Sequence, residues 1–326
     1  MKQKMKISYE FIMFLILAAL IVLFGILTGG IFFDPAVILG TTSDIAYLGI
    51  MAMPMTFVIL TSGIDLSVGF MMVSSAMVFS VVYQATGYHI LFAVLACLAS
   101  GFVFGSINGV IAAKTKINPW LITMSTMYIF QSITWFFGTS YAFSTGYAIT
   151  NFGYGTIGIV PNQLIVLLIS FAVFYILDKK TTFGRYIHAI GYNEHAVNYS
   201  GVNANKMKYF AYMIMGVVCS VSAMMYLGKS WQVNQTTAVN MNIEVIALVV
   251  LGGTSTAGGV GGVTGTLFAA LIVGVLKRGL ALMGLGGDVY NFVLGGVLIA
   301  SLIMFAYLEK KKKIVSREMA IKNMDE

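Results

Sequence analysis

The chain is dominated by long, nearly continuous apolar runs, each of a length that could cross a lipid bilayer. A transmembrane helix needs about 20 mostly apolar residues, so 326 residues leave room for about ten spans with short loops. Only 10% of the residues are charged, whereas a soluble domain has about a quarter. The sequence therefore predicts an all-α, polytopic transmembrane bundle. The spans are expected near 11–28, 45–62, 69–86, 90–113, 119–138, 162–177, 209–228, 243–257, 262–282 and 289–308.

Basic residues are distributed unevenly between the two sides that such a bundle would have. Cytoplasmic segments of membrane proteins are enriched in Lys and Arg. With the N-terminus in the cytoplasm, only three of the 19 Lys and Arg residues fall on or near the far side, namely Lys229, Lys277 and Arg278. An even number of crossings places the basic tail 309–326 in the cytoplasm as well. The pattern predicts that both termini are cytoplasmic.

We expect one transmembrane domain over residues 1–326, with two connections long enough to have roles of their own. The outer loop 139–161 is rich in Gly, Tyr, Thr and Asn and could meet an extracytoplasmic partner. The inner segment 178–208 is the only sizeable cytoplasmic feature between spans. Its pattern predicts two short helices separated by a glycine turn. This segment is too short to be a domain, but it could be a docking surface.

Glycine is concentrated in two places with different meanings. Gly101, Gly105 and Gly109 recur every four residues, which puts them on one helix face and favours close helix packing in lipid. The stretch 252–262 contains too many glycines for a helix to continue. The chain must break there, either as a pore-lining break or as a tight cytoplasmic hairpin.

The stretch 61–69 holds one carboxylate, Asp65, between two apolar runs. Its glycines and hydroxyls suit a sharp turn, which is either a gate element on a substrate path or a simple cap of the third span at the cytoplasmic edge. Asn108 could bond across helices or contact a polar solute. Three further acidic residues near predicted outer ends are interpreted as interface residues: Asp44, Glu244 and Asp288.

The sequence offers no catalytic, metal or cofactor pattern. Cys97 and Cys219 lie inside apolar runs and are expected to be buried packing residues. Residues 223–230 resemble a phosphate-binding loop, but they end an apolar span instead of opening a helix after a strand. We therefore expect no enzyme and no cofactor. If the protein moves a solute uphill, the energy must come from a partner or from an ion gradient.

Four ordered blocks carry a resemblance to a known family. They are Gly63 to Gly69, Gly105 to Gly109 with Lys116 to Thr123, Gly184 to Val202, and Leu251 to Thr266. On these blocks the chain resembles the permease subunits of bacterial ABC importers for ribose and related sugars, from about Tyr47 to Leu308. Tyr192 and Val260 depart from the family's usual glycine and basic residue.

Within this family the chain looks most like the D-type permeases of autoinducer-2 importers. The grounds are Thr42 to Ile45, Gly49 to Ile50, Pro54 to Thr56 and Thr115 to Pro119. The resemblance implies autoinducer-2 as cargo, with ribose or another monosaccharide as the alternative. It also implies a place in the cytoplasmic membrane and several partners: two ATPase subunits, a second permease subunit (homologous or identical) and an extracytoplasmic solute-binding protein.

The same resemblance implies roles for individual residues. Coupling to the ATPase would involve Gly184, Arg185, Gly191, Asn193, Glu194, Ala196 and Gly201. The translocation path or its gate would include Gly63, Asp65, Ser67, Gly69, Asn108, Gly252, Gly253 and Thr254. An ion-coupled secondary transporter is the alternative from another class, although its ion sites usually need charges that the central spans lack.

Overall fold

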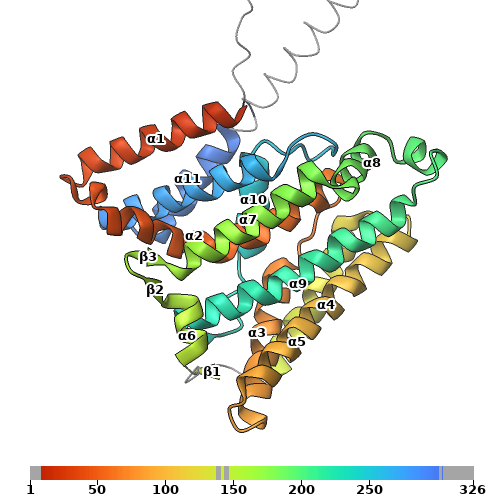
Figure 1. The fold of residues 1–326 in the computed structure, drawn as a ribbon, viewed down its shortest axis with the longest axis horizontal. Helices are drawn as coiled ribbons and strands as arrows, with labels where there is room; N and C mark the ends of the chain where they lie inside the picture. The colour runs from red at the N-terminus through yellow and green to blue at the C-terminus, as the bar shows by residue number, and fades with distance from the viewer. Residues whose placement is uncertain (1–8, 137–140, 143–146, 301–302, 304–326) are drawn as a thin grey trace, which may run out of the picture.

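The computed structural model describes residues 9–136, 141–142, 147–300 and 303, and their regular structure is almost entirely helical (Figure 1). The helices are α1 (Tyr9–Leu27), η1 (Ile31–Phe33), α2 (Pro35–Leu60), α3 (Val68–Ala85), α4 (Ile90–Lys114), α5 (Pro119–Phe136), α6 (Tyr147–Tyr154), α7 (Asn162–Lys180), α8 (Thr182–Tyr199), α9 (Ala204–Ser230), α10 (Met241–Leu251), α11 (Val263–Leu282) and a further apolar helix, Gly287–Ala300. Four short strands pair antiparallel, β1 (Tyr141–Ala142) with β4 (Gln232–Val233) and β2 (Thr156–Ile157) with β3 (Val160–Pro161). The predicted tail 309–326 lies outside the described residues.

The predicted polytopic helical architecture is confirmed. Among the described residues, 7 helices are long and apolar enough to cross a membrane: α1, α2, α3, α4, α7, α9 and α11. The spans predicted at 119–138 and 289–308 correspond to α5 and Gly287–Ala300, which are helical but not counted with the seven. The span predicted at 243–257 is shorter than expected, because α10 ends at Leu251 after 11 residues.

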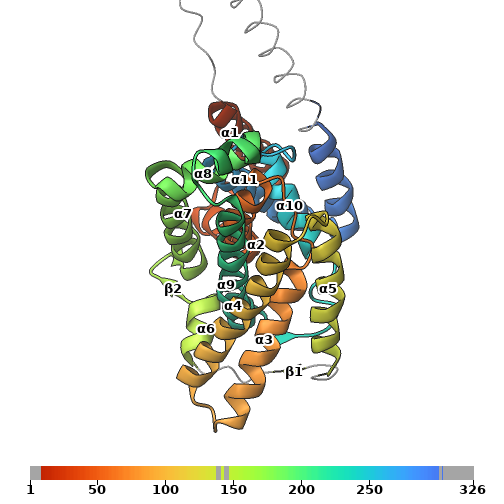
Figure 2. The same ribbon diagram turned by 90° about the vertical axis from the view of Figure 1, so that its right-hand side faces the viewer.

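Helix α2 forms the centre of the bundle. It begins with Pro35 directly after Asp34, whose carboxylate accepts a hydrogen bond from the Ala36 N–H (2.8 Å), a typical N-terminal cap. From Ile45 to Leu60 every residue of α2 is buried, and α7, α9, α10 and α11 pack around it (Figures 1 and 2). A helix that is apolar on all sides must be enclosed by other apolar groups, and the four neighbouring helices enclose α2.

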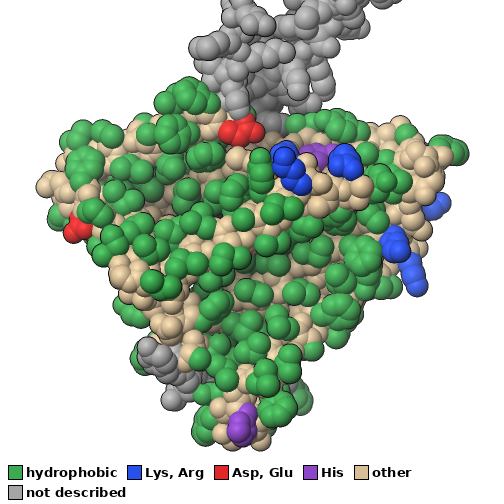
Figure 3. All heavy atoms as spheres, viewed as in Figure 1, with side chains coloured by type: hydrophobic (Ala, Val, Ile, Leu, Met, Phe, Trp, Pro, Cys, Tyr) green, Lys and Arg blue, Asp and Glu red, His purple; other side chains and the backbone are tan. Residues whose placement is uncertain are grey.

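The surface of the molecule is apolar, as a lipid-facing surface must be. Apolar side chains cover most of the face shown in Figure 3, whereas Lys and Arg gather toward the end that carries α8. Large exposed apolar residues occur on α1, α4, α5 and α7, for example Ile26, Phe102, Ile129 and Ile169. The polar ends and the apolar belt match the division that a bilayer imposes.

Helices α4 and α9 pack so closely that their backbones touch. A Cβ atom on Gly101 would lie 2.3 Å from the Gly216 carbonyl oxygen, and one on Gly105 would lie 2.5 Å from the Tyr212 carbonyl oxygen. A Cβ on Gly109 would be 2.8 Å from the carbonyl oxygen of Tyr209. The predicted packing role of the three α4 glycines is confirmed, and their partner is α9.

Candidate functional site

A fully buried polar cluster occupies the break between α2 and α3. Asp65 accepts hydrogen bonds from the Ser67 N–H (2.9 Å) and the Ser67 hydroxyl (2.6 Å). Asn108 of α4 donates from Nδ2 to Ser67 Oγ (2.8 Å) and to the other Asp65 oxygen (3.3 Å). Thr123 of α5 accepts from the Leu66 N–H (3.1 Å). Asn108 therefore bonds across elements, and Ser67 rather than Asp65 takes the N-cap position of α3.

Tyr212 of α9 lies against the same break, and sequence reasoning did not identify it. A Cβ atom on Gly63 would lie 2.6 Å from Tyr212 Oη, so the ring hydroxyl occupies the space that a side chain would need. Tyr212 is only 1% exposed, and its hydroxyl has no hydrogen-bond partner among the described residues. A buried polar atom without a partner is uncommon and marks a place where a ligand or water would be held.

Gly69 accommodates a non-helical segment that runs back into the bundle. After α9 the residues 231–240 form no helix before α10 begins, and Ala238 in this segment is 2% exposed. A Cβ on Gly69 would lie 3.0 Å from the Ala238 carbonyl oxygen. Since α10 has 11 residues, it is about 16 Å long, roughly half of the hydrocarbon core. The bundle thus contains a half-length helix with a run of turns leading into it.

Three segments far apart in the sequence interlock beside α8, and we call this place the α8 junction: the end of α2 (60–62), the middle of α8 (188–192) and the loop 257–259. The Gly259 N–H donates to the Leu60 carbonyl (2.9 Å), and Ser62 Oγ donates to the Ala257 carbonyl (2.8 Å). A Cβ on Gly191 would lie 2.0 Å from Leu60 O and 2.1 Å from the Gly259 nitrogen. The α8 backbone therefore contacts both other segments directly.

His188 fastens this junction through both ring nitrogens. Nδ1 lies 2.8 Å from the Gly259 carbonyl oxygen, and Nε2 lies 2.8 Å from a carboxylate oxygen of Asp178, whose side chain is buried. Because both neighbours are acceptors, the imidazolium form can donate to both at once. The hydrogen bond to Asp178 raises the pKa of His188 above its usual value, and burial offsets that rise only in part. No sequence pattern predicts this pairing.

The predicted coupling residues lie along α8 and at its ends. Asn193 leaves helical geometry (φ −161°, ψ 96°), and its Oδ1 accepts from the Ala196 N–H (3.0 Å), so a second helical stretch starts there. The predicted break in this segment therefore exists, but it lies at Asn193 rather than at a glycine. Glu194 pairs with Lys208 of α9 (2.6 Å). Gly201 has φ +86° and ends the segment.

Gly184 and Arg185 lie at the start of α8 and differ in exposure. Gly184 is buried, because a Cβ there would lie 2.2 Å from the Asp178 carbonyl oxygen. Arg185 is exposed to solvent. The first turn of α8 therefore presents a free cationic side chain above a tight turn from α7.

A cavity of about 320 Å³ opens beneath the kinked α8, and we call it the α8 cavity. It joins residues that the sequence assigned to separate roles: Gly63 from the predicted gate, and Gly191, Asn193 and Glu194 from the predicted coupling segment. Helix α9 contributes Lys208 and Tyr212. Asp65, Ser67 and Asn108 are not among its lining residues. The described residues include no group of three His, Cys, Asp or Glu side chains placed to hold a metal.

The predicted gate residues of the second glycine-rich stretch pack inside the loop between α10 and α11. A Cβ on Gly252 would lie 2.5 Å from the Thr266 nitrogen, and one on Gly253 would lie 2.6 Å from the Tyr9 ring. Thr254 is 2% exposed and packs against Gly261. These residues tie α10, α11 and the start of α1 together, and none of the three lines the α8 cavity.

Charged residues pair at the opposite end of the bundle, where α9 ends. Asp44 accepts from Lys229 (3.1 Å) and pairs with Arg278 (3.4 Å), and Lys277 lies over the Tyr290 ring. All three basic residues assigned to the outer side thus have a partner, and Asp44 acts as a counterion rather than as a lone interface residue.

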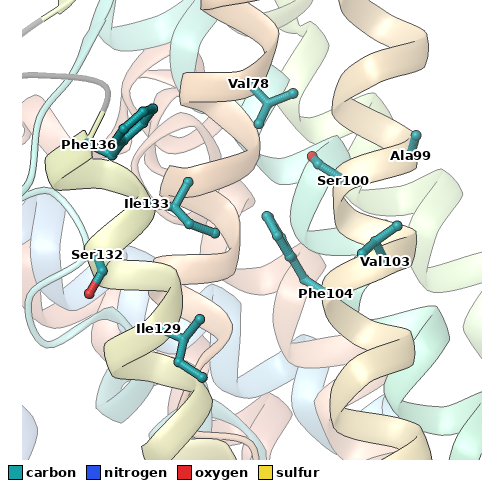
Figure 4. Close-up of a pocket in the computed structure, with 9 residues that line it drawn as sticks. All are labelled: Val78, Ala99, Ser100, Val103, Phe104, Ile129, Ser132, Ile133 and Phe136. Atoms are coloured by element: carbon teal, nitrogen blue, oxygen red, sulfur yellow. The ribbon is translucent and has the colours of Figure 1, made fainter.

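A larger, shallow hollow lies between α3, α4 and α5 on the apolar surface (Figure 4). Phe104, Ile133 and Val103 point into it, and its two serines, Ser100 and Ser132, donate to carbonyls of their own helices. All other residues that line this hollow are apolar, so it suits lipid chains rather than a polar solute.

Comparisons with known proteins agree with this geometry. Residues 37–302 match the family model described as the branched-chain amino acid transport system / permease component. The ribose import permease RbsC of Escherichia coli K12 is 36% identical over 81% of this chain and 82% of its own length. The fructose import permease FrcC of Rhizobium meliloti is 33% identical (87% and 81%), and the autoinducer 2 import permease LsrD of Klebsiella pneumoniae is 31% identical (91% and 91%). No solved structure matches the chain.

Proposed function

We propose that this chain, which belongs to the permease family of ABC importers and is a non-catalytic membrane subunit of the sugar type, carries autoinducer-2 or ribose across the cytoplasmic membrane. Relatives bearing both names match most of the chain, which supports these two cargoes. Autoinducer-2 is additionally favoured by the D-type blocks at 42–45 and 115–119. Both candidates are small polar solutes.

The α8 junction supports a mechanism in which movement of α8 is transmitted to the bundle helices. ATPase subunits docked on the cytoplasmic side of α8 would displace it, and Gly191 and His188 would pass that movement to the end of α2 and to the loop 257–259. Both segments continue into bundle helices, so a rigid shift there would reach the break at Asp65. We infer two ATPase subunits, a second permease subunit and an external binding protein as partners.

The test is uptake by the reconstituted importer. ATP-driven uptake of labelled ribose or autoinducer-2 should require the ATPase and binding protein, and unlabelled cargo of the correct kind should compete. Gly191→Ala should lower uptake, because the added Cβ would meet the backbone of both other segments of the junction and such overpacking costs about 1–3 kcal/mol. Gly286→Ala is the matched control, because no atom lies within 4 Å of its added Cβ.

Uptake that persists without the ATPase and follows an ion gradient would instead assign the chain to the secondary transporters. Uptake of neither cargo by an importer that hydrolyses ATP would reject the proposed substrate class.

A further inference from the structure

We propose that the α8 cavity is a binding subsite for a neutral, polyhydroxylated solute at the cytoplasmic end of the permease. The inference rests on the proposed sugar-type cargo and adds a site within a single subunit. It assigns a binding role to Tyr212, Thr61 and Ser62, residues that belong to neither the gate nor the coupling set above.

Residues that line the cavity carry hydroxyl groups with unused hydrogen-bonding capacity. Tyr212 Oη is buried and lacks a partner among the described residues, although it lines the cavity. Beside it, the Thr61 hydroxyl donates to the Val58 carbonyl (2.8 Å) and the Ser62 hydroxyl donates to the Ala257 carbonyl (2.8 Å). Each of these two oxygens keeps lone pairs that can accept from a ligand hydroxyl. Three residues that line the cavity therefore carry one hydroxyl without a partner among the described residues and two hydroxyl oxygens that can still accept.

The charges around the cavity favour a neutral ligand over an ionic one. Glu194 and Lys208 both line it, but they form an ion pair at 2.6 Å, so their charges compensate each other. A sulfate, phosphate or ammonium group would find no uncompensated opposite charge in this pair. Hydroxyl groups, in contrast, can bond to the free lone pairs of the carboxylate without disturbing it.

The size and the apolar wall fit a sugar-sized molecule. At about 320 Å³ the cavity is at the small end of the range for ligand sites. Ala112 and Ile190 form an apolar side, and Tyr192 lies at the mouth with 70% of its surface exposed. A few convergent polar groups on an apolar and aromatic wall are typical of small-molecule sites. The exposed residues Ser62 and Asn193 also line the cavity, which gives access from the α8 side.

Cysteine protection in the assembled importer tests the subsite. Tyr192→Cys introduces a thiol at the cavity mouth, and Tyr199→Cys, on the same helix and 92% exposed, is a matched control away from the cavity. The two native cysteines, Cys97 and Cys219, are fully buried. Maleimide labelling of inside-out vesicles is measured with D-ribose, with autoinducer-2 and with leucine as a non-hydroxylated probe.

We expect ribose or autoinducer-2, but not leucine, to slow labelling at position 192 and not at 199. Tyr212→Phe removes only the hydroxyl and should raise the half-protecting concentration about tenfold, the value of one hydrogen bond. Tyr209→Phe is the control, because that hydroxyl lies on the same helix but contacts Ser106 (3.3 Å) instead of the cavity.

Two results would overturn the subsite. One is unchanged labelling at 192 with every probe in an importer that still takes up ribose or autoinducer-2, which leaves the proposed function standing. The other is protection that depends on the ATPase subunit and not on any solute, which would assign the cavity to the ATPase contact. Loss of uptake with all cargoes in the unmodified importer would instead reject the proposed function.

Discussion

At the scale of single residues, the buried carboxylate of Asp65 determines how the chain can leave the helix in the middle of the bundle. The break from Thr61 to Ser67 exposes backbone groups that lipid cannot satisfy. Asp65 satisfies the N–H and the hydroxyl of Ser67, and Asn108 and Thr123 connect the turn to two further helices. The irregular backbone persists because protein groups bond to its buried part around Asp65 and Ser67.

Asp65→Asn and Asp65→Leu should therefore differ in stability. The amide keeps an acceptor for Ser67, and Asn108 Oδ1, which has no partner among the described residues, can accept from the new NH₂ group. We expect a cost of about 1 kcal/mol for Asn and about 3 kcal/mol or more for Leu, which leaves buried donors unpaired. Thermal unfolding of the detergent-solubilised protein measures the difference, and equal midpoints for the two variants would contradict the role of the cluster.

The sequence pattern identified the packing glycines of α4 but not the residues of α9 that they contact. The four-residue spacing of Gly101, Gly105 and Gly109 was sufficient to predict a packing face, because helix geometry is local. Tyr212 and His188 could not be found in this way. A tyrosine within an apolar run is expected to be an ordinary core residue. The contact of Tyr212 with Gly63 joins residues nearly half the chain apart, and such a contact depends on tertiary packing alone.

At the scale of elements, α4 and α9 form a pair that cannot separate without losing backbone contact. A Cβ on Gly216 would lie 2.1 Å from the Gly101 carbonyl oxygen, so a larger residue would force the helices apart. Gly216→Val should therefore abolish most of the monodisperse protein on gel filtration. Gly296→Val, with no atom within 4 Å of the added Cβ, should leave the profile unchanged. A normal profile for Gly216→Val would show that the two helices do not pack in this way.

Helix α8 should respond to pH through His188. The raised pKa means that the folded junction favours the protonated ring. Its contribution is therefore complete below the ordinary histidine pKa of about 6.5 and is lost as pH rises through the raised value. Asp178 and Lys179 are the charged groups facing the ring. Burial would raise the pKa of Asp178, but its bonds to His188 and Lys179 outweigh that effect and lower the pKa, so Asp178 stays ionised across this range.

The measurement is the unfolding temperature of wild type and His188→Gln from about pH 6 to about pH 9, around the ordinary histidine value. The difference between the two proteins should shrink as pH rises. His195→Gln, an exposed histidine on the same helix, should show no such trend. A constant difference for His188→Gln would mean that the ring does not bind its two acceptors as a cation.

Elements were predicted well where a single apolar run makes a single helix. Most expected spans coincide with helices to within a few residues, as for α4 and α9. The predicted span 243–257 failed because its apolar run continues through Gly252, whereas the helix stops at Leu251. The glycine-rich stretch 252–262, where a break was predicted, begins at the residue after this end. The close approach of Gly252 to Thr266 of α11, in contrast, has no local pattern.

At the scale of the whole molecule, the helices divide into two ends, and the basic residues predict which end is cytoplasmic. The start of α1, the end of α10 and α8 lie at one end, since Tyr9 Oη donates to the Leu251 carbonyl (2.7 Å) and the loop that follows contacts His188. The positive-inside rule assigns that end to the cytoplasm. Helix α6 and the β2–β3 hairpin lie at the other (Figure 1).

Membrane-impermeant thiol labelling in cells tests this orientation. Tyr199→Cys on α8 and Ile159→Cys in the β2–β3 connection are both well exposed, at 92% and 68%. We expect Ile159→Cys to react from outside and Tyr199→Cys only after the membrane is opened. The reverse labelling pattern would show that α8 faces the outside, where an ATPase subunit could not dock on it.

The ion pairs of Asp44 also have a consequence for how the protein is made. Asp44 precedes Lys229 by 185 residues, so it is already in the membrane when the ribosome delivers its partners. Lys229 belongs to α9 and Arg278 to α11, so both ion pairs of Asp44 can close only after these late helices have been synthesised and have packed against α2.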